Sequence, residues 1–285
     1  MTILVDFNPV VISAISVMTS NDGLDERSIR HLCINMLLSY KNKFSADYGE
    51  MVITCDSKDS WRKDIYPYYK FSRKKSREDS PLDWPLIFSI LNEIHEELMH
   101  YFPYKVIKID KLEADDIIGV LSRYITANKT VGLWGDAEKV LIVSGDKDFN
   151  QLHDANIRQW TPKFKRFLVE PNPSRFLAEH IIIGDKSDGV PNIKSPDDIF
   201  VLDKRQSPIH EKFLESVLST GIVPEEYKEN YERNRKMIDL SLIPDEYQQA
   251  IIAEYESIKP ASRMKLMTYF TKKGLNQLYD KANQF

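Results

Sequence analysis

The hydrophobic residues of the first half of the chain fall into two kinds of segment that alternate. Short, almost continuously apolar runs have the length of buried strands. These runs are ILVDF (3–7), MVITCD (51–56), KVIKID (105–110) and KVLIVSGD (139–146). Longer segments at 25–44, 84–102 and 113–128 repeat apolar residues every three or four positions, as amphipathic helices do. This alternation predicts a parallel sheet wound with right-handed crossovers.

The pattern changes in the second half of the chain. Runs at 157–162 and 165–170 predict one more pair of strands. From residue 185 onwards, helical stretches are separated by Pro and polar residues, and there is no series of strands. We therefore expect an α/β domain over residues 1–184 and an all-helical region over 185–285. We also expect the first part to remain folded after truncation near residue 190.

The composition is that of an ordinary globular protein. Hydrophobic residues make up 42% and charged residues 29%, which argues against global disorder. The N-terminal stretch has no basic region and carries Asp6 within its apolar run, which argues against a signal peptide or a membrane span. Cys33 and Cys55 have no metal-binding spacing, and we expect two reduced core thiols in a cytoplasmic protein that does not bind membranes.

The chain as a whole has a net charge of −4, but residues 58–77 form a strongly basic segment. Eight Lys or Arg residues stand there against two Asp residues, giving a local charge of +6. The interleaved aromatic residues are Trp61, Tyr66, Tyr68, Tyr69 and Phe71. Bases neutralise phosphates and aromatic rings stack on nucleobases, so this mixture favours nucleic-acid binding. The alternative is a solvated helical face whose aromatic residues belong to the core.

Acidic residues mark four successive strand–helix junctions. They are Asp6, Asp56, Glu113, Asp115, Asp116, Asp146 and Asp148, and a further pair, Asp185 and Asp188, follows the next helix. Because the carboxyl ends of parallel strands meet at one edge of a sheet, these side chains should lie together. Any one of them could simply cap a helix. To explain all four consecutive junctions, capping would have to coincide at each of them.

Carboxylates crowded into one cleft repel each other unless cations compensate them. Ligands that offer only oxygen favour Mg²⁺ or Mn²⁺ over Zn²⁺. Two such ions roughly 4 Å apart can activate a water and stabilise the leaving oxygen of a phosphoryl displacement. The acids therefore predict a site for two Mg²⁺ ions, for which Mn²⁺ can substitute, and chemistry on phosphodiesters.

Six ordered motifs resemble those of one enzyme family. They are VDF (5–7), CDS (55–57), WRKDIYPYYKFSRKKSR (61–77), EADD (113–116), SGDKDFNQL (144–152) and GDKSDGVP (184–191). Together they resemble the flap endonuclease, or structure-specific 5′ nuclease, family, and most closely its bacteriophage ribonuclease H branch. The resemblance implies a PIN-like parallel sheet flanked by helices, a helical arch at about residues 57–84, and a C-terminal helical region that grips DNA.

The resemblance also implies a role for each matched residue. One metal ion would be held by Asp6, Asp56, Glu113, Asp115 and Asp146. A second would be held, partly through waters, by Asp148, Asp185 and Asp188, with Asp116 in an outer layer. Lys70 and Arg73 would contact the scissile phosphate. The remaining nucleic-acid contacts would come from Arg62, Lys63, Tyr66, Lys74, Lys75, Arg77, Lys186 and Lys194.

The implied activity is that of a 5′ to 3′ nuclease acting on DNA and RNA·DNA duplexes with 5′ ends, nicks or flaps. Such an enzyme would remove RNA primers during replication, as a monomer in the host cytoplasm, with a single-strand-binding protein and a sliding clamp as partners. Two alternatives are a PIN-type ribonuclease acting on single-stranded RNA and a non-catalytic branched-DNA binding protein. One departure from the family stands at 189–200, where GVPNIKSPDDIF replaces a glycine-rich turn and makes a monovalent-cation site there doubtful.

Overall fold

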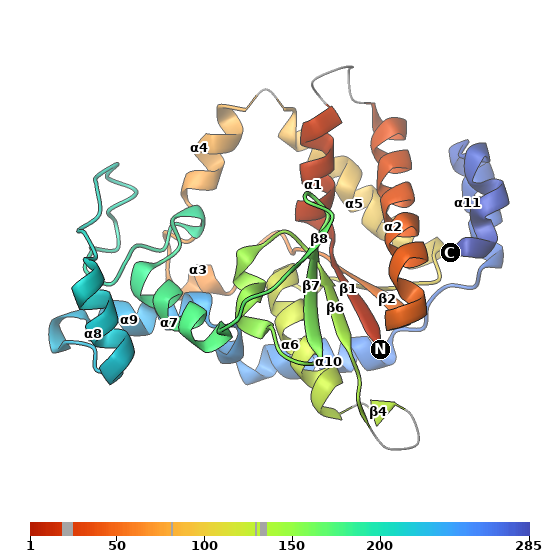
Figure 1. Ribbon diagram of the computed structural model, residues 1–285. Helices are drawn as coiled ribbons and strands as arrows, with labels where there is room; N and C mark the ends of the chain where they lie inside the picture. Colours follow the sequence, from red (N-terminus) through yellow and green to blue (C-terminus); the bar gives the residue numbers. More distant parts are fainter. Residues whose placement is uncertain (19–24, 81, 129, 132–135) are drawn as a thin grey trace.

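A six-stranded sheet in the order β3-β2-β1-β6-β7-β8 forms the centre of the molecule (Figure 1). The computed structural model describes residues 1–18, 25–80, 82–128, 130–131 and 136–285. Its strands are β1 (Thr2–Asp6), β2 (Glu50–Thr54), β3 (Lys105–Ile107), β4 (Thr130–Val131), β5 (Asp136–Ala137), β6 (Val140–Val143), β7 (Ile157–Thr161) and β8 (Arg166–Leu168).

Helices account for most of the remaining described residues. The α-helices are α1 (Phe7–Met18), α2 (Glu26–Tyr48), α3 (Arg62–Ile65), α4 (Ser72–Glu78), α5 (Trp84–Tyr101), α6 (Ala114–Asn128), α7 (Pro173–Ile183), α8 (Glu211–Thr220), α9 (Lys228–Ile238), α10 (Asp245–Ser257) and α11 (Met264–Lys273). The short 3-10 helices are η1 (Lys147–Leu152), η2 (Lys186–Asp188), η3 (Glu225–Tyr227), η4 (Leu240–Leu242) and η5 (Asn276–Gln284).

The first strand of the chain lies in the middle of the sheet. β1 pairs in parallel with β2 on one side and with β6 on the other, so that Ile3 lies opposite both Met51 and Leu141. β3 and β7 extend the sheet in parallel, and β8 returns antiparallel to β7. The parallel sheet and the additional strand pair predicted from the sequence are therefore confirmed.

The strands are apolar at consecutive positions because both faces of the sheet are covered. In β1, Ile3 and Val5 belong to one core and Leu4 to the other. The first core is closed by residues of α1, α2, α5 and α11, and the second by residues of α6, α10 and η1. All three β1 residues are fully buried. This arrangement fixes the sheet register, since a shift by one residue would exchange the two faces.

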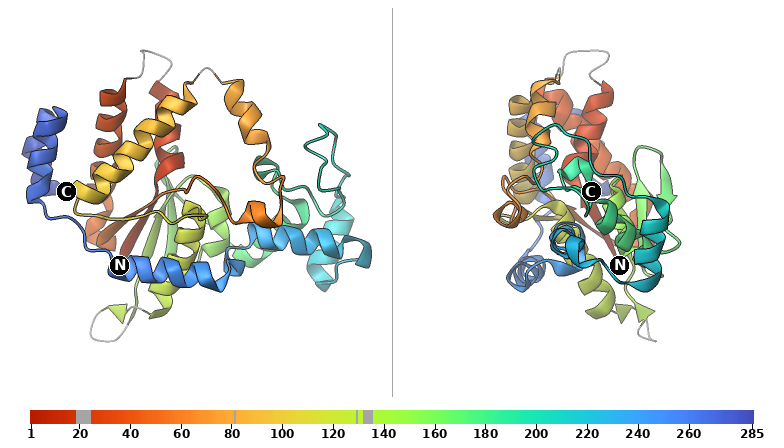
Figure 2. Two further views of the ribbon diagram at one scale, coloured as in Figure 1. Left: turned by 180° about the vertical axis from the view of Figure 1, so that it is seen from behind. Right: turned by 90° about the vertical axis from the view of Figure 1, so that its left-hand side faces the viewer.

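The C-terminal region does not stay on one side of the molecule. Helices α7, α8 and α9 gather at one end of the sheet, α10 runs along it beside α6, and α11 lies at the far end (Figures 1 and 2). Leu266, Phe270 and Phe285 belong to the same core as Ile3. Truncation near residue 190 would remove these side chains from the core, so we expect that residues 1–190 would not remain stably folded alone.

Three elements were absent from the sequence prediction. Helix α1 follows β1 without a break, and β4 and β5 form a small separate antiparallel pair. The three helices predicted at 25–44, 84–102 and 113–128 correspond to α2, α5 and α6. Among the described residues, no helix is both long and apolar enough to cross a membrane.

Candidate metal centre

Four carboxylates from separate elements gather at the carboxyl edge of the parallel strands. Asp6 is the last residue of β1, Asp56 follows β2 by two residues, and Asp146 caps η1 directly after β6. Asp115 lies in the first turn of α6. The backbone N–H of Ala114 donates to Asp56 Oδ1 at 2.9 Å, which ties the start of α6 to the end of β2. The structure thus brings these predicted residues together.

The four carboxylates repel one another across a shared space. Burial, followed by the charge of Asp56, raises the pKa of Asp6 well above its ordinary value. Burial also raises the pKa of Asp115, with further increases from Asp146 and Asp6. Asp6 Oδ2 accepts a hydrogen bond from the Ser144 hydroxyl at 2.7 Å, but its buried Oδ1 has no hydrogen-bond partner. Such a site favours either protons or cations.

A second acidic group adjoins the first. Asp148, in η1, lies close enough to Asp146, Asp185 and Asp188 for their charges to affect it, and burial followed by the charge of Asp146 raises its pKa to about 7. Asp185 behaves differently. Burial alone would raise the pKa of Asp185, but hydrogen bonds from His180 and Ser187 and the charge of Lys147 lower it. The Lys147 ammonium lies 3.1 Å from Asp185 Oδ2.

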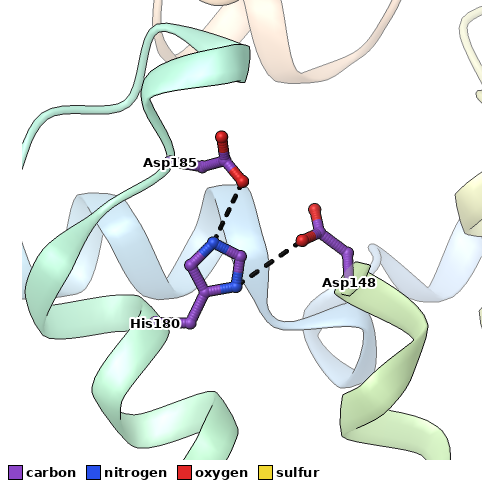
Figure 3. Close-up of side chains that lie close together, drawn as sticks. All are labelled: Asp148, His180 and Asp185. Atoms are coloured by element: carbon purple, nitrogen blue, oxygen red, sulfur yellow. Dashed lines mark hydrogen bonds and ion pairs between the residues drawn. The ribbon is translucent and has the colours of Figure 1, made fainter. Parts of the chain in front are cut away.

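His180 stands between the two carboxylates of this second group (Figure 3). Its Nε2 lies 3.0 Å from Asp185 Oδ2, and its Nδ1 lies 3.6 Å from Asp148 Oδ1. A tight turn at Gly184 (φ +75°) joins His180 to Asp185, and a Cβ at this glycine would lie 2.5 Å from the carbonyl oxygen of Val190. Any other side chain would therefore disturb the turn that holds this pair.

The two basic residues predicted to act from the arch, Lys70 and Arg73, form ion pairs with residues of the acidic cluster. Lys70 forms ion pairs with Glu113 and with Asp188, the latter at 3.6 Å, and Arg73 contacts Asp188 at 2.5 Å. Lys70 has a left-handed backbone (φ +57°), held by a 2.8 Å hydrogen bond from its N–H to the carbonyl oxygen of Asp188. The Tyr69 hydroxyl lies 2.8 Å from Glu113 Oε2 and 2.9 Å from Asp188 Oδ2, so either carboxylate can accept its one proton. Although burial would raise the pKa of Glu113, Lys70 and Arg62 lower it to about 2.

Arg62 requires a correction, because it is not an exposed phosphate contact. Its side chain is buried and forms ion pairs with Glu113 at 3.2 Å and Asp116 at 2.8 Å. Its Nε donates to the carbonyl oxygen of Met237 at 2.9 Å. Asp116 also accepts hydrogen bonds from Trp61 Nε1 and from the N–H of Glu113. Arg62 and Asp116 therefore support Glu113 from the protein interior, and an outer-layer role for Asp116 stays a prediction.

Tyr66 is also buried, contrary to its predicted contact with nucleic acid. Its hydroxyl lies 2.6 Å from the carbonyl oxygen of Asp197 and 3.1 Å from that of Gly189, and the shorter contact is the better hydrogen bond. Trp61 and Tyr69 are buried as well, whereas Phe71 is 57% exposed. Most aromatic residues of the basic segment thus anchor it to the protein. Of the four, only Phe71 is exposed enough to stack on a nucleobase.

The other predicted nucleic-acid contacts are more accessible. Lys63 is exposed and paired with Asp59 at 3.0 Å, and Arg77 is exposed, with its guanidinium over the Phe88 ring. Lys186 is exposed, and Lys194 is half-buried with its ammonium 3.6 Å from the Phe213 ring centroid. The predictions for Lys74 and Lys75 concern side chains that lie outside the described part of the structure. Whether these bases contact nucleic acid stays a prediction.

The donor atoms of the cluster fit divalent cations. Asp6 Oδ1 and Asp148 Oδ1 are buried and accept no hydrogen bond, which is costly for a carboxylate unless a cation faces it. Around Asp6, Asp56, Asp115 and Asp146 the acidic side chains offer oxygen atoms, as hard ions require. The sequence indicated these acids, but no motif or spacing singled out His180 or Lys147. Their arrangement emerges only when α7 packs against η1.

Comparison with known proteins identifies relatives over the whole chain. Residues 3–178 match the 5′-3′ exonuclease N-terminal resolvase-like domain, and residues 176–285 match the C-terminal domain of T4 RNase H. Ribonuclease H of Enterobacteria phage T4 is 31% identical over 99% of this chain and 95% of its own length. The 5′-3′ exonuclease of Mycoplasma pneumoniae is 24% identical over 90% of this chain and 87% of its own length.

Solved structures have the same fold. The T5 D15 protein co-crystallised with metal ions has a TM-score of 0.57 at 15% identity, covering 95% of this chain and 97% of that one. A T5 D15 flap endonuclease complex with DNA and metal ions has a TM-score of 0.60 at 15% identity, covering 90% and 99%. With the sequence relatives, these matches confirm the PIN-like fold with its helical C-terminal region. The chain belongs to the 5′-3′ exonuclease family and is a nuclease of that family.

Proposed function

We propose that this nuclease hydrolyses phosphodiester bonds at the 5′ ends of DNA and RNA·DNA duplexes, including nicks and flaps, and so removes RNA primers during replication. The observation that supports this most directly is the contact between the basic arch segment and the acidic cluster. Lys70 and Arg73 already lie on Glu113 and Asp188. A phosphate bound beside the acids would therefore meet both bases without a large movement of the chain.

We propose that two Mg²⁺ ions bind the acids, and that Mn²⁺ can replace them. The first would be held by Asp6, Asp56, Glu113, Asp115 and Asp146. The second would be held by Asp148, Asp185 and Asp188. When bound, such ions supply a Lewis acid for the phosphate and a nucleophile at neutral pH. The buried Oδ1 atoms of Asp6 and Asp148, which have no hydrogen-bond partner, support this assignment.

Lys70 and Arg73 would act on the phosphate itself. Each is held by acidic groups that cations would neutralise, so cation binding would weaken these ion pairs and release both bases toward the substrate. Negative charge grows on the phosphate oxygens in the transition state, and a positioned cation stabilises it more than the ground state. Lys63, Lys74, Lys75, Arg77, Lys186 and Lys194 would neutralise backbone phosphates at a greater distance.

The wider setting is also a proposal. Residues 1–184 would carry the chemistry, with the arch at about 57–84, and residues 185–285 would grip the duplex. We propose that the protein acts as a monomer. We also propose that it acts in the cytoplasm of an infected bacterial cell, because a relative that matches 99% of this chain comes from a phage. A single-strand-binding protein and a sliding clamp remain candidate partners.

The substrates can be separated in one experiment. RNA·DNA hybrid, nicked duplex, 5′-flap and single-stranded RNA, each labelled at the 5′ end, are incubated with Mg²⁺, with Mn²⁺ and with EDTA. Short labelled products from the duplexes alone, and only with metal, would support the proposal. Cleavage of single-stranded RNA alone would instead favour a PIN-type ribonuclease, and binding without products would favour a branched-DNA binding protein. The Asp146→Asn variant serves as the inactive control.

A further inference from the structure

His180 lies among the acids of the second cation position and has no role in the function proposed above. The residue is almost completely buried, with only 7% of its surface exposed. It extends from α7 into the space between Asp148 and Asp185 (Figure 3). Within the described part of the chain, these three residues form the one group of His, Cys, Asp and Glu whose ligand atoms all lie within 4.8 Å of one another.

The two ring nitrogens are in different situations. Nε2 lies 3.0 Å from Asp185 Oδ2 and 3.5 Å from Lys147 Nζ. An ionised carboxylate can only accept a hydrogen bond, so Nε2 carries the proton and donates to Asp185. In a neutral imidazole, Nδ1 then presents a lone pair. That lone pair faces Asp148 Oδ1 at 3.6 Å, and neither buried atom has a hydrogen-bond partner. Two buried acceptors that face each other require either a proton or a cation between them, and at 3.6 Å they are too far apart for a good hydrogen bond.

The separation of these two atoms suits a metal ion. Ligand atoms at about 2.1 Å from one ion, with ligand–metal–ligand angles between 90° and 120°, lie roughly 3.0–3.6 Å apart. A histidine that binds a metal ion usually donates its other N–H to a carboxylate, as His180 does to Asp185. Asp185 is also heavily engaged, because its Oδ1 accepts from the N–H and the hydroxyl of Ser187 at 2.7 and 2.6 Å.

We propose that His180 Nδ1 and Asp148 Oδ1 are ligands of the second cation, and that Asp185 positions His180 as its hydrogen-bond acceptor. Imidazole ligands suit transition-metal ions, whereas Mg²⁺ strongly prefers oxygen. The second position therefore binds Mn²⁺ in preference to Mg²⁺, while the all-oxygen cluster around Asp6 does not discriminate in this way. The proposal rests on the cation site of the proposed function and changes both its ligand set and its metal preference.

The test measures metal binding and does not depend on cleavage. Mn²⁺ is titrated into the full chain, free Mn²⁺ is followed by its electron paramagnetic resonance signal, and pulsed measurements on the bound ion detect coupling to ¹⁴N. We expect ¹⁴N coupling in the parent protein, its loss in His180→Gln, and its retention in His210→Gln, a control at the start of α8. His180→Gln should weaken Mn²⁺ binding at one site by about tenfold or more, with a smaller effect on Mg²⁺ competition.

Two results would overturn the proposal. One is the absence of ¹⁴N coupling in the parent protein at saturating Mn²⁺, which would mean that His180 is a protonated partner of the two carboxylates. The other is coupling that persists in a folded His180→Gln protein. If that variant does not fold, labelling the parent protein with [¹⁵N]histidine decides the matter, because a ligating histidine must replace the ¹⁴N coupling with a ¹⁵N coupling. Loss of nuclease activity on every substrate, with the nitrogen coupling intact, would refute the proposed function alone.

Discussion

Replacing Arg62 should reduce the stability of the protein far more than its affinity for DNA. The guanidinium is buried, pairs with Glu113 and Asp116, and donates to the carbonyl oxygen of Met237 on α9. In Arg62→Met the aliphatic volume is largely kept, but Asp116, which is fully buried, loses its cation. Removing one partner of a buried ion pair typically costs about 3–5 kcal/mol. Since a domain is stable by about 5–15 kcal/mol, this is a large fraction of the total.

The assay is urea unfolding followed by tryptophan fluorescence, with Arg77→Met as the matched control. Arg77 is an exposed arginine of the same basic segment. At an m-value of about 3 kcal/mol/M, the Arg62→Met midpoint should fall by roughly 1–1.7 M. Arg77→Met should leave the midpoint nearly unchanged and weaken binding of nicked duplex in fluorescence anisotropy. An unchanged midpoint for Arg62→Met, together with weaker DNA binding, would refute the assignment of Arg62 to the interior.

A double-mutant cycle isolates the ion pair. Asp116→Asn removes the charge that Arg62 compensates, so Arg62→Met should cost less in that background than in the parent protein. For residues in direct contact the expected coupling is about 0.5–3 kcal/mol. Additive effects of the two substitutions would show that the loss in Arg62→Met comes from packing or from the bond to Met237, and not from the pair.

Four further predictions follow from the site and the core. Asp146→Asn should abolish cleavage in Mg²⁺ and leave affinity for nicked duplex similar or higher, because a negative charge facing the phosphate is lost; single-turnover assays and anisotropy separate the two effects. Lys70→Ala should lower single-turnover cleavage at saturating enzyme by about 10² or more, whereas Arg77→Ala should affect the dissociation constant and its salt dependence. Burial raises the pKa of Asp148 from 3.8 to about 7. In metal-free protein this group therefore contributes stability that is present below pH 4 and is lost as the pH rises through 7. Mg²⁺ should raise Tm more at pH 8 than at pH 5, and an equal increase at both pH values would count against the site. A fragment of residues 1–190 should lack a cooperative thermal transition, and a sharp transition near that of the full chain would contradict the core described above.

The sheet and most of the acidic cluster could be predicted because they depend on local pattern. Apolar runs of strand length can be recognised directly in the sequence. Parallel pairing of the strands then brings their carboxyl ends to one edge of the sheet, whatever the positions of the helices. Helix α1 was not predicted, since its apolar residues follow those of β1 without a break, and the helix-start signal of Asn8 and Pro9 in its first turn was not used. Local pattern therefore identified the sheet but not every helix packed on it.

The basic segment shows where sequence reasoning fails. The basic and aromatic residues at 58–77 favoured nucleic-acid contacts from Arg62 and Tyr66, yet both side chains are buried and bind partners more than 120 residues away in the sequence. His180 was not predicted as a site residue for the same reason, because its site forms only when α7 packs beside η1. The available signal was an isolated histidine five residues before Asp185, and such a spacing is common in helices that bind nothing. Partners distant in sequence leave no periodic pattern to detect.

The position of β1 at the centre of the sheet bears on how the chain folds. The core around Ile3 is closed by Leu266 and Phe270, more than 250 residues later. At a synthesis rate of about 5–20 residues per second, roughly 13–50 s separate the emergence of these segments from the ribosome. During that interval β1 and α1 expose apolar surface that their final partners cannot yet cover. Folding of this nuclease should therefore be slow and dominated by long-range contacts, and nascent chains should depend on chaperones that shield the first half until the last helices arrive.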